Sequence, residues 1–321
     1  MSRKYSPKVF SYRLGGFAAM AMPRMFYSSG GARLERLFRE SADQEYILER
    51  VDYYNRISSP FSLPEDAVTL REMARGRRHS IYRIDLWKGT RNFDPSLRIS
   101  YEFGDVNWIE KVPVITKSRP ICDGNSNNVI LKLDRCRHFN FISDPIAFRD
   151  KSDMGVFRAD IGDAQKQNRA EFMHKWFGSG ICDCGSIRNM PGLPDEWIRP
   201  RMSIEEQLKY KYILSLEGND VATSLKWIMS SNSIAVMPKP TCETWFMEGT
   251  LLPGVHYIEI RPDFSDLDEK LEYYSSHPEE CLHIIDNAHK YVSRFAGDND
   301  IREQIIEYLV LKKYFELSGQ I

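Results

Sequence analysis

The alternation of short apolar runs with helical segments after residue 150 is the feature that most constrains the fold. GVFRA at 155–159, YILSL at 212–216 and SIAVM at 233–237 have the length and composition of buried strands. Helical patterns at 168–177 and 221–231 separate these runs. Strands that alternate with helices predict a parallel sheet covered by helices. Sheets of this kind bind ligands outside the carboxyl ends of their strands.

The first half of the chain predicts a second, less regular α/β unit. Apolar residues on one face predict a helix over 43–57. Segments 80–87, 98–106 and 112–118 are rich in β-branched and aromatic residues and predict strands. Residues 129–143 predict one helix or two short elements. The chain has 321 residues, which suits two domains with a cleft between them.

The end of the chain predicts three further elements, and with them the chain can be divided into domains. We expect a strand over 255–260, a helix over 266–276 and an amphipathic helix over 301–317. Together these segments predict an amino-terminal arm, two α/β domains and a carboxyl-terminal helix, bounded as 1–40, 41–150, 151–300 and 301–321.

The amino-terminal arm mixes basic and bulky apolar residues. Its short apolar run FAAMAM cannot span a bilayer, which needs about 20 residues, and the arm lacks the apolar core of a secretory signal. The composition is typical of a segment that lies on an anionic membrane surface. A packed or disordered basic arm explains it equally well. The basic residues are Arg3, Lys4, Lys8, Arg13, Arg24, Arg33, Arg36 and Arg39.

Net charge and cysteine spacing exclude several classes of protein. A formal net charge of −1 excludes a global nucleic-acid-binding surface, so we expect no nucleic-acid partner. The six cysteines have no disulfide-framework spacing, which favours reduced thiols in the cytoplasm. Cys182 and Cys184 lie near His174, but a zinc site normally needs four ligands at recognisable spacing, so we expect no metal.

The segment SLEGNDVATSLKW is placed where a strand gives way to a helix. Gly218 removes a side chain where the backbone must approach another group closely. Asp220, Thr223 and Ser224 offer capping oxygens for the predicted helix, whose amino terminus would attract phosphate. Simple helix capping is the alternative interpretation. The chain has no dinucleotide fingerprint and no P-loop sequence.

Two arginines and two glutamates complete the candidate groups of the second half. Arg158 follows a predicted strand and Arg169 opens the next helix, so their guanidinium groups could bind a pyrophosphate. Surface ion pairs are the ordinary alternative for each. Glu243 and Glu248 flank an aromatic pair, an arrangement that suits sugar hydroxyls or, alternatively, a loop anchored by a buried tryptophan.

These segments, taken in order, resemble a known family. KYKYILSLEGNDVATSLKWIMSSNSIAVM and ETWFMEGTLLPGVHYIEIRPDFSDLDEKL are similar to the lipopolysaccharide-A type glycosyltransferases of bacteria. These enzymes belong with the Rumi-type protein O-glucosyltransferases in glycosyltransferase family ninety. PVITKSRP, RHFNFISD and FRAD occur in the same order. The resemblance covers about residues 100–295.

The resemblance implies a GT-B fold, in which two Rossmann-like domains face a cleft. Residues 41–150 would form the acceptor-side domain and 151–300 the nucleotide-sugar domain. The donor would be a nucleotide-diphosphate sugar, usually UDP-linked, transferred with inversion and without a metal or other cofactor. The donor site would take Arg158, Arg169, Gly218, Asp220, Thr223, Ser224, Lys226 and Glu243. Ser224 stands where the Rumi branch has an arginine, which leaves Lys226 as the cation of that segment.

The general base is the least specific part of the resemblance. An inverting transfer needs a carboxylate that accepts the proton of the acceptor hydroxyl. The family places an aspartate shortly after the strand that corresponds to PVITKS, and the match falls near Asn125. Asp123 is therefore the first candidate and Asp105 the second. Both could instead be turn residues. The Asp–X–Asp patterns at 266–268 and 298–300 are interpreted as a helix start and a polar loop.

Three functions remain open on the sequence. The first is a cytoplasmic glycosyltransferase, resting on the inner membrane through its basic arm, that adds a sugar to a lipopolysaccharide core or a related surface glycan. The second is a protein O-glycosyltransferase, although the chain lacks the secretory signal of the Rumi branch. The third is a non-catalytic protein that binds nucleotides or glycans on the same fold. Donor and acceptor are the expected partners in the first two.

Overall fold

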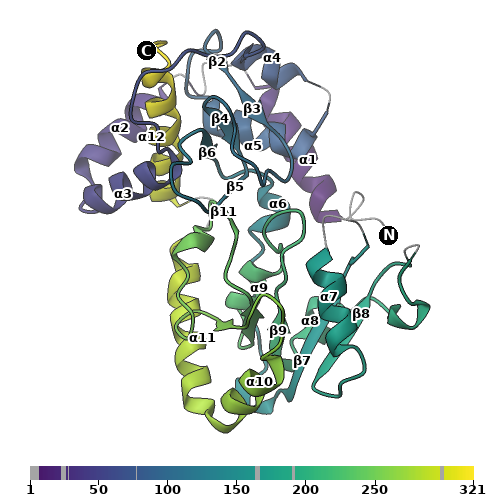
Figure 1. Ribbon diagram of the computed structural model, residues 1–321. Helices are drawn as coiled ribbons and strands as arrows, with labels where there is room; N and C mark the ends of the chain where they lie inside the picture. Colours follow the sequence, from purple (N-terminus) through teal and green to yellow (C-terminus); the bar gives the residue numbers. More distant parts are fainter. Residues whose placement is uncertain are drawn as a thin grey trace. The chain divides into compact units, whose positions relative to one another are not determined.

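The computed structural model describes residues 7–22, 27, 29–76, 78–162, 167–189, 192–296 and 300–321. Its contacts divide the chain into two units (Figure 1). Unit 1 combines residues 1–138 with 242–245 and 297–321, and unit 2 combines 139–241 with 246–296. These bounds differ from the predicted domains because α12 (Ile301–Leu317) packs against α2, α3 and α5 of the first unit.

Unit 2 contains the predicted parallel sheet. Its strands have the order β12-β10-β9-β7-β8, and every pair is parallel. The four-residue strand β10 is wholly buried, as its run of apolar residues predicts. The strands are β7 (Ser152–Ala159), β8 (Cys182–Ser186), β9 (Tyr210–Leu214), β10 (Ile234–Met237) and β12 (Ile258–Glu259).

The helices of unit 2 pack against this sheet. α11 contacts β10 and α9, whereas α10 contacts β7 and α7 contacts β8. Proline at its first position begins α11, the longest helix of the unit, which the sequence analysis did not predict. The helices are α7 (Gln167–Trp176), α8 (Ile204–Gln207), α9 (Leu225–Met229), α10 (Leu267–Ser276) and α11 (Pro278–Ser293).

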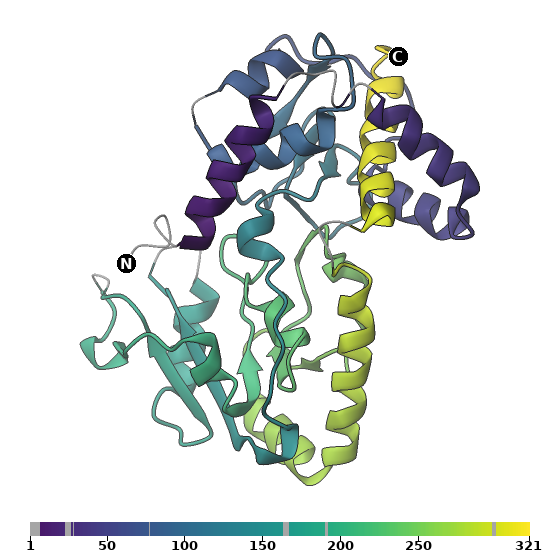
Figure 2. The same cartoon turned by 180° about the vertical axis from the view of Figure 1, so that it is seen from behind.

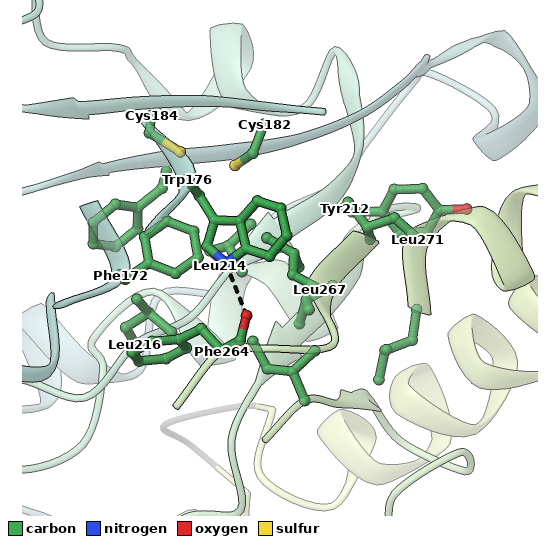
Figure 3. Packing of buried hydrophobic residues seen from close by; sticks show 14 of the residues in the cluster. Phe172, Trp176, Cys182, Cys184, Tyr212, Leu214, Leu216, Phe264, Leu267 and Leu271 are labelled. Carbon is green, nitrogen blue, oxygen red and sulfur yellow. Dashed lines mark hydrogen bonds between the residues drawn. The ribbon is translucent and has the colours of Figure 1, made fainter. Parts of the chain in front are cut away.

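The core of unit 2 is aromatic. Phe172 packs edge-on against Phe157 and Phe264, with ring centroids 5.1 and 5.3 Å apart. Figure 3 shows the indole of Trp176, whose Nε1 donates to the Phe264 carbonyl at 2.8 Å. Cys182 and Cys184 project into the same cluster from β8 and are buried free thiols. Both cysteines are therefore core residues.

Unit 1 has short strands and several helices. β3, β4 and β6 form a parallel sheet, whereas β1 pairs with β2 and β5 pairs with β11 in antiparallel ladders. The strands are β1 (Val68–Thr69), β2 (Arg98–Ile99), β3 (Tyr101–Glu102), β4 (Val114–Thr116), β5 (Ser118–Pro120), β6 (Asn128–Ile130) and β11 (Cys242–Thr244). The other helices are α1 (Pro7–Met20), α2 (Gly30–Glu40), α3 (Gln44–Tyr54), α4 (Leu70–Arg75), α5 (Ser80–Thr90) and α6 (Arg135–His138).

The strand predicted over 80–87 is wrong, because these residues form α5. Helices α1, α4 and α12 all pack on α5, and four consecutive residues, 83–86, are buried. A half-exposed strand would alternate buried and exposed side chains, and these residues do not alternate. Packing against the three helices therefore overrides the strand preference of Ile, Tyr and Trp. The helix over 301–317 is confirmed, but Glu303 and Glu307 are buried with its apolar residues, so polarity does not separate its faces.

Candidate functional site

The sheet of unit 2 has a topological switch point between β7 and β9. The chain places β8 on one side of β7 and then crosses to β9, β10 and β12 on the other side. Loops that follow β7 and β9 therefore diverge at the carboxyl edge of the sheet. A crevice forms at such a point and is the usual ligand site of open parallel sheets.

Arg169 fastens the two diverging loops together. Its Nη1 donates to the carbonyl of Asp160, directly after β7, at 2.9 Å. Its Nη2 and Nε donate to the carbonyls of Leu216 and Glu217, after β9, at 2.7 and 2.9 Å. A Cβ at Gly218 would lie 3.0 Å from Nη2 of Arg169. A side chain at position 218 would therefore crowd this guanidinium group, and the structure brings these two predicted residues together.

A second link joins the loops after β9 and β10. The carboxylate of Glu217 accepts a hydrogen bond from the backbone N–H of Thr241 at 3.0 Å and another from its hydroxyl. The amide of Asn168 in α7 also donates to the carbonyl of Glu217, at 3.2 Å. Loops from three neighbouring strands therefore form one connected frame.

This frame borders a cavity of about 180 Å³. A drug-sized ligand usually occupies about 300–1,000 Å³, so the cavity suits one ring of a larger molecule. Apolar side chains form most of the lining, which favours the flat face of a base or sugar. The lining residues are Asn168, Ser215, Glu217, Val221, Ala222, Leu225, Met237, Pro238, Lys239, Pro240, Thr241, Glu248, Pro262 and Phe264.

Two lining residues offer polar groups that the sequence analysis did not single out. Ser215 is buried, and its hydroxyl has no hydrogen-bond partner among the described residues. A buried hydroxyl without a partner is costly, which makes it a candidate ligand contact. Lys239 is exposed at the cavity and forms no ion pair within the described part of the chain. The sequence signal that could have identified both residues is their position just after the strands β9 and β10, where ligands usually bind.

Arg158 is used elsewhere in unit 2. Alternation along β7 places Phe157 in the hydrophobic cluster and Arg158 on the other face of the sheet. Its Nη2 lies 2.6 Å from a carboxylate oxygen of Asp183, and its Nη1 donates to the Asp183 carbonyl at 2.8 Å. Arg158 does not line the cavity, whereas residues of the loop after β9, which Arg169 contacts, do line it.

The helix predicted over 221–231 is shorter than expected, because α9 covers only Leu225–Met229. A single turn offers little of the dipole on which the expected phosphate site depends. Ser224 precedes this turn without forming a side-chain cap, and Thr223 is half-buried beside it. Asp220 is buried, and its carbonyl accepts from the N–H of Gly218 at 2.9 Å. None of these three residues lines the cavity.

Lys226 faces the interior. Its side chain is fully buried, forms an ion pair with Glu248 and lies 5.3 Å from the ring centroid of Phe246. Glu248 lines the cavity, whereas Lys226 lies behind it. The ammonium group therefore neutralises a protein carboxylate in this structure, and does not lie at the cavity surface as a diphosphate-binding cation would.

Glu243 belongs to unit 1, contrary to its expected place in the nucleotide-sugar domain. It lies in β11, which pairs with β5. Its carboxylate is fully buried, 2.8 Å from Nε of Arg119 and 3.1 Å from Nη2 of Arg56, and accepts a hydrogen bond from Tyr53. The indole of Trp245 stacks on Tyr54 with centroids 3.9 Å apart. The alternative interpretation, a loop anchored by buried tryptophan, describes this segment.

The two candidate bases have different surroundings in unit 1. Asp105 follows β3 and pairs with Lys117, which follows β4, and with Arg137 of α6 at 3.4 Å. Burial favours the neutral form of Asp105, but the two cations outweigh it and hold the pKa below its ordinary value. Asp123 lies exposed in a turn with Gly124, whose φ is +74°. The turn alternative fits Asp123, whereas Asp105 is held ionised at the end of a parallel sheet.

The Asp–X–Asp pattern at 266–268 begins a helix, as expected. Asp266 precedes α10 and accepts from the N–H of Arg261 at 2.8 Å. Asp300 begins α12 by accepting from the N–H of Arg302 at 2.8 Å, whereas Asp298 lies outside the described residues. Over the described ranges, no group of three or more His, Cys, Asp or Glu side chains is arranged to hold a metal ion.

Helix length and hydropathy give one further finding. Within the described segments, none of the helices combines the length and apolar character that crossing a bilayer requires.

Comparison with known proteins identifies the class of this α/β fold. The sequence profile of Glycosyl transferase family 90 matches residues 193–318, which include most of the cavity. The O-glucosyltransferase LpsA of Dichelobacter nodosus is 43% identical over 296 residues, covering 92% of this chain and 91% of that protein. The chain belongs to glycosyl transferase family 90 and is a glycosyltransferase.

More distant relatives agree with this assignment. Protein O-glucosyltransferase 2 of Danio rerio is 32% identical over 83 residues, 26% of this chain and 16% of that protein. The uncharacterized protein 035R of Invertebrate iridescent virus 3 is 32% identical over 226 residues, 68% of this chain and 18% of that protein. The family resemblance stated from the sequence is confirmed.

Proposed function

We propose that the protein transfers glucose from a UDP-linked donor to a lipopolysaccharide-type glycolipid, with inversion at the anomeric carbon. The observation that carries the proposal is the cavity at the switch point of unit 2, framed by Arg169 and lined by Lys239 and Ser215. Support for the sugar and the acceptor class comes from the name of the bacterial relative, O-glucosyltransferase LpsA.

Three residues have different roles in the proposed donor site. Arg169 is a positioning residue, because its guanidinium group holds the carbonyls that shape the crevice. Lys239 supplies a charge for the diphosphate, and Ser215 a hydroxyl for the base or sugar. Fixed groups of this kind stabilise the negative charge that develops on the leaving diphosphate. We propose that the nucleotide sugar is a co-substrate and that neither a metal nor a cofactor is needed.

In the proposed chemical step Asp105 is the general base. The acceptor hydroxyl oxygen forms a bond to the anomeric carbon while the bond from that carbon to the diphosphate oxygen breaks. The hydroxyl proton passes to the carboxylate of Asp105, and the bonding electrons leave with UDP. A carboxylate that Lys117 and Arg137 keep ionised is ready to accept this proton at neutral pH. The two-domain GT-B arrangement, with the base on one domain and the donor on the other, is part of the proposal.

A donor panel tests the proposal. The purified protein is incubated with UDP-glucose, UDP-galactose and UDP-N-acetylglucosamine together with a lipopolysaccharide core, and UDP release and acceptor mass are measured. We expect a mass gain of one hexose with UDP-glucose. Lys239→Ala should raise the donor KM at least tenfold. The matched control is Lys290→Ala, an exposed lysine of α11 paired with Asp286. Modification of a protein substrate alone would favour the protein O-glycosyltransferase alternative.

Donor binding without turnover is the remaining outcome. If UDP binds but no acceptor gains mass, the protein binds nucleotides without transfer, and the proposed inverting mechanism is wrong for this chain. Loss of UDP binding in both lysine variants alike would remove Lys239 from the donor site.

A further inference from the structure

Four aromatic side chains of unit 1 gather beside the end of β3, and we call them the surface aromatic cluster. The rings of Tyr101 and Phe103 stack with their centroids 4.3 Å apart. The rings of Tyr82 in α5 and of His79, which precedes α5, lie 5.4 and 6.0 Å from the ring of Phe103. His79 is exposed and the other three are partly exposed, so the cluster reaches the surface of the unit.

Another aromatic cluster of unit 1 shows what core packing produces. Phe93 stacks on Tyr308 with centroids 4.8 Å apart, and its ring lies 5.0 Å from that of Phe315. All three of these residues are buried. Rings that fill a core are covered in this way, whereas the surface aromatic cluster leaves ring area open to solvent. Contiguous apolar area that stays exposed marks a contact surface.

α1 packs on a different side of α5 from Tyr82. A Cβ at Gly16 of α1 would lie 2.6 Å from the side chain of Ile84. Figure 2 shows α1, in dark purple, along unit 1. Tyr82 precedes Ile84 by two residues, which places it about 200° around the helix. The ring of Tyr82 therefore points away from α1 and toward Phe103.

Tyr82 connects the surface aromatic cluster to the charged groups around Asp105. Its hydroxyl donates to the carboxylate of Asp134, which lies 2.8 Å from Nε of Arg137. Nη2 of Arg137 in turn lies 3.4 Å from a carboxylate oxygen of Asp105. Phe103 and Asp105 are separated by one residue, so their Cα atoms are at most about 7 Å apart. A molecule that lies on the ring of Phe103 is therefore a neighbour of Asp105.

The surface aromatic cluster has the chemistry of a sugar-binding subsite. One face of a pyranose carries C–H groups that pack on a flat aromatic ring, whereas its hydroxyls need hydrogen-bond partners at the edge of that ring. Phe103 offers the flat face, and His79 and Asp105 offer polar groups beside it. Aromatic side chains with a few polar groups among them are typical of ligand sites.

We propose that the surface aromatic cluster binds a pyranose ring of the acceptor glycan. The ring stacks on Phe103, with one hydroxyl beside His79 and another directed to Asp105. The role of this contact in transfer rests on the proposed function, because Asp105 is the proposed base. Binding of the glycan needs neither a donor nor transfer, so it can be measured separately from catalysis.

Nuclear magnetic resonance with a lipid-free glycan tests the inference. The probe is the core oligosaccharide released from lipopolysaccharide by mild acid, mixed with the full chain in the absence of any donor. Saturation of the aromatic protons of the protein should pass to the C–H protons of one sugar ring. Phe103→Leu keeps an apolar side chain but removes the flat face, so the Kd for the oligosaccharide should rise about tenfold, the size of one aromatic contact. Phe103→Tyr keeps the flat face and should bind as the unchanged protein does.

A second variant alters the polar edge of the subsite. His79 is exposed, so His79→Ala should leave the fold intact. Loss of one hydrogen bond to a sugar hydroxyl should raise the Kd for the oligosaccharide about threefold. The saturation signal on the stacked sugar ring should persist, because Phe103 is still present.

The control changes another stacked and exposed ring. Tyr273 of α10 is 45% exposed and stacks on His277 with centroids 4.1 Å apart. Tyr273→Leu should leave the Kd for the oligosaccharide unchanged, and the thermal transition of each variant shows that it is folded. An unchanged Kd in Phe103→Leu or His79→Ala, equal losses in both leucine variants, or no binding by the unchanged protein would overturn the proposal. Binding that depends on Phe103 without any transfer of glucose would count against the proposed function only.

Discussion

The carboxyl edges of the two parallel sheets are held in different ways. In unit 2, Arg169 and the Glu217–Thr241 link join loops mainly through backbone groups, and Lys239 is left exposed at the cavity. In unit 1, the edge is held by side-chain charges, with Asp105 between Lys117 and Arg137. A backbone frame fixes shape and leaves charge available to a ligand, whereas paired charges fix the protonation state of a side chain. The first suits donor binding and the second suits proton transfer.

Removal of the carboxylate of Asp105 should have the largest effect. General base catalysis contributes about 10²–10⁴-fold, so we expect Asp105→Asn to lower kcat about 10³-fold. The Kd for UDP, measured by calorimetry, should be the same as in the unchanged protein. Asp123→Asn is the matched control, and its kcat should stay within about twofold, because a surface turn takes no part in the proposed step. Equal losses in both variants would remove Asp105 from its assigned role.

Glu243→Gln should act on stability. The change leaves the fully buried Arg119 without its carboxylate, and breaking a buried ion pair costs about 3–5 kcal/mol. Urea unfolding should show a loss of this size, while the Kd for UDP below the transition stays the same. The control, Glu279→Gln, breaks an exposed pair with Arg149 and should cost less than about 1 kcal/mol. A weakened Kd in the folded Glu243→Gln protein would restore this residue to the donor site.

Gly218→Ala tests the frame around the crevice. The added Cβ would press on Nη2 of Arg169 at 3.0 Å and displace the loop after β9. We expect the donor KM to rise about tenfold, a free-energy change of about 1.4 kcal/mol, with a smaller change in kcat. Gly15→Ala is the control, because a Cβ there meets nothing within 4 Å. An unchanged KM would show that the guanidinium position does not matter for donor binding.

Arg137→Gln should have the smallest effect, which should be visible only in the pH dependence of kcat/KM. Burial raises the pKa of Asp105, and Lys117 and Arg137 lower it further than burial raises it. A base with a lowered pKa loses activity only at acidic pH, when it becomes protonated. Removal of one cation raises that pKa, so the acidic limb of kcat/KM should move to higher pH while the plateau stays nearly constant. A shift to lower pH would contradict the assigned electrostatics.

The sequence predicted unit 2 better than unit 1, for a physical reason. The apolar runs 212–216 and 233–237 are buried and overlap β9 and β10, whose observed bounds are Tyr210–Leu214 and Ile234–Met237, so local sequence reveals these strands. Residues 80–87 are also rich in β-branched and aromatic residues, but they pack against α1, α4 and α12, and α12 lies more than 200 residues away. Contacts so distant in sequence leave no local pattern.

The candidate site was predictable in outline only. Arg169, predicted to open a helix, lies in α7, and Gly218 lies in the loop after β9, where their contact joins them at the carboxyl edge of the sheet; their roles in donor binding stay predictions. Glu243 and Lys226 were assigned by their position beside the motif, but both are buried with partners that no spacing rule discloses, Arg119 and Glu248. Ser215 and Lys239 were missed because a single serine or lysine after a strand carries no distinctive pattern.

A crystal structure of the protein with UDP tests the central claim most directly. The account predicts the nucleotide at the carboxyl edge of the unit 2 sheet, with a diphosphate oxygen within about 3.2 Å of Nζ of Lys239 and a polar atom of UDP equally close to the hydroxyl of Ser215. Arg169 should keep its bonds to the carbonyls after β7 and β9. UDP bound beside Asp105 in unit 1, or bound in unit 2 away from Lys239 and Ser215, would contradict it.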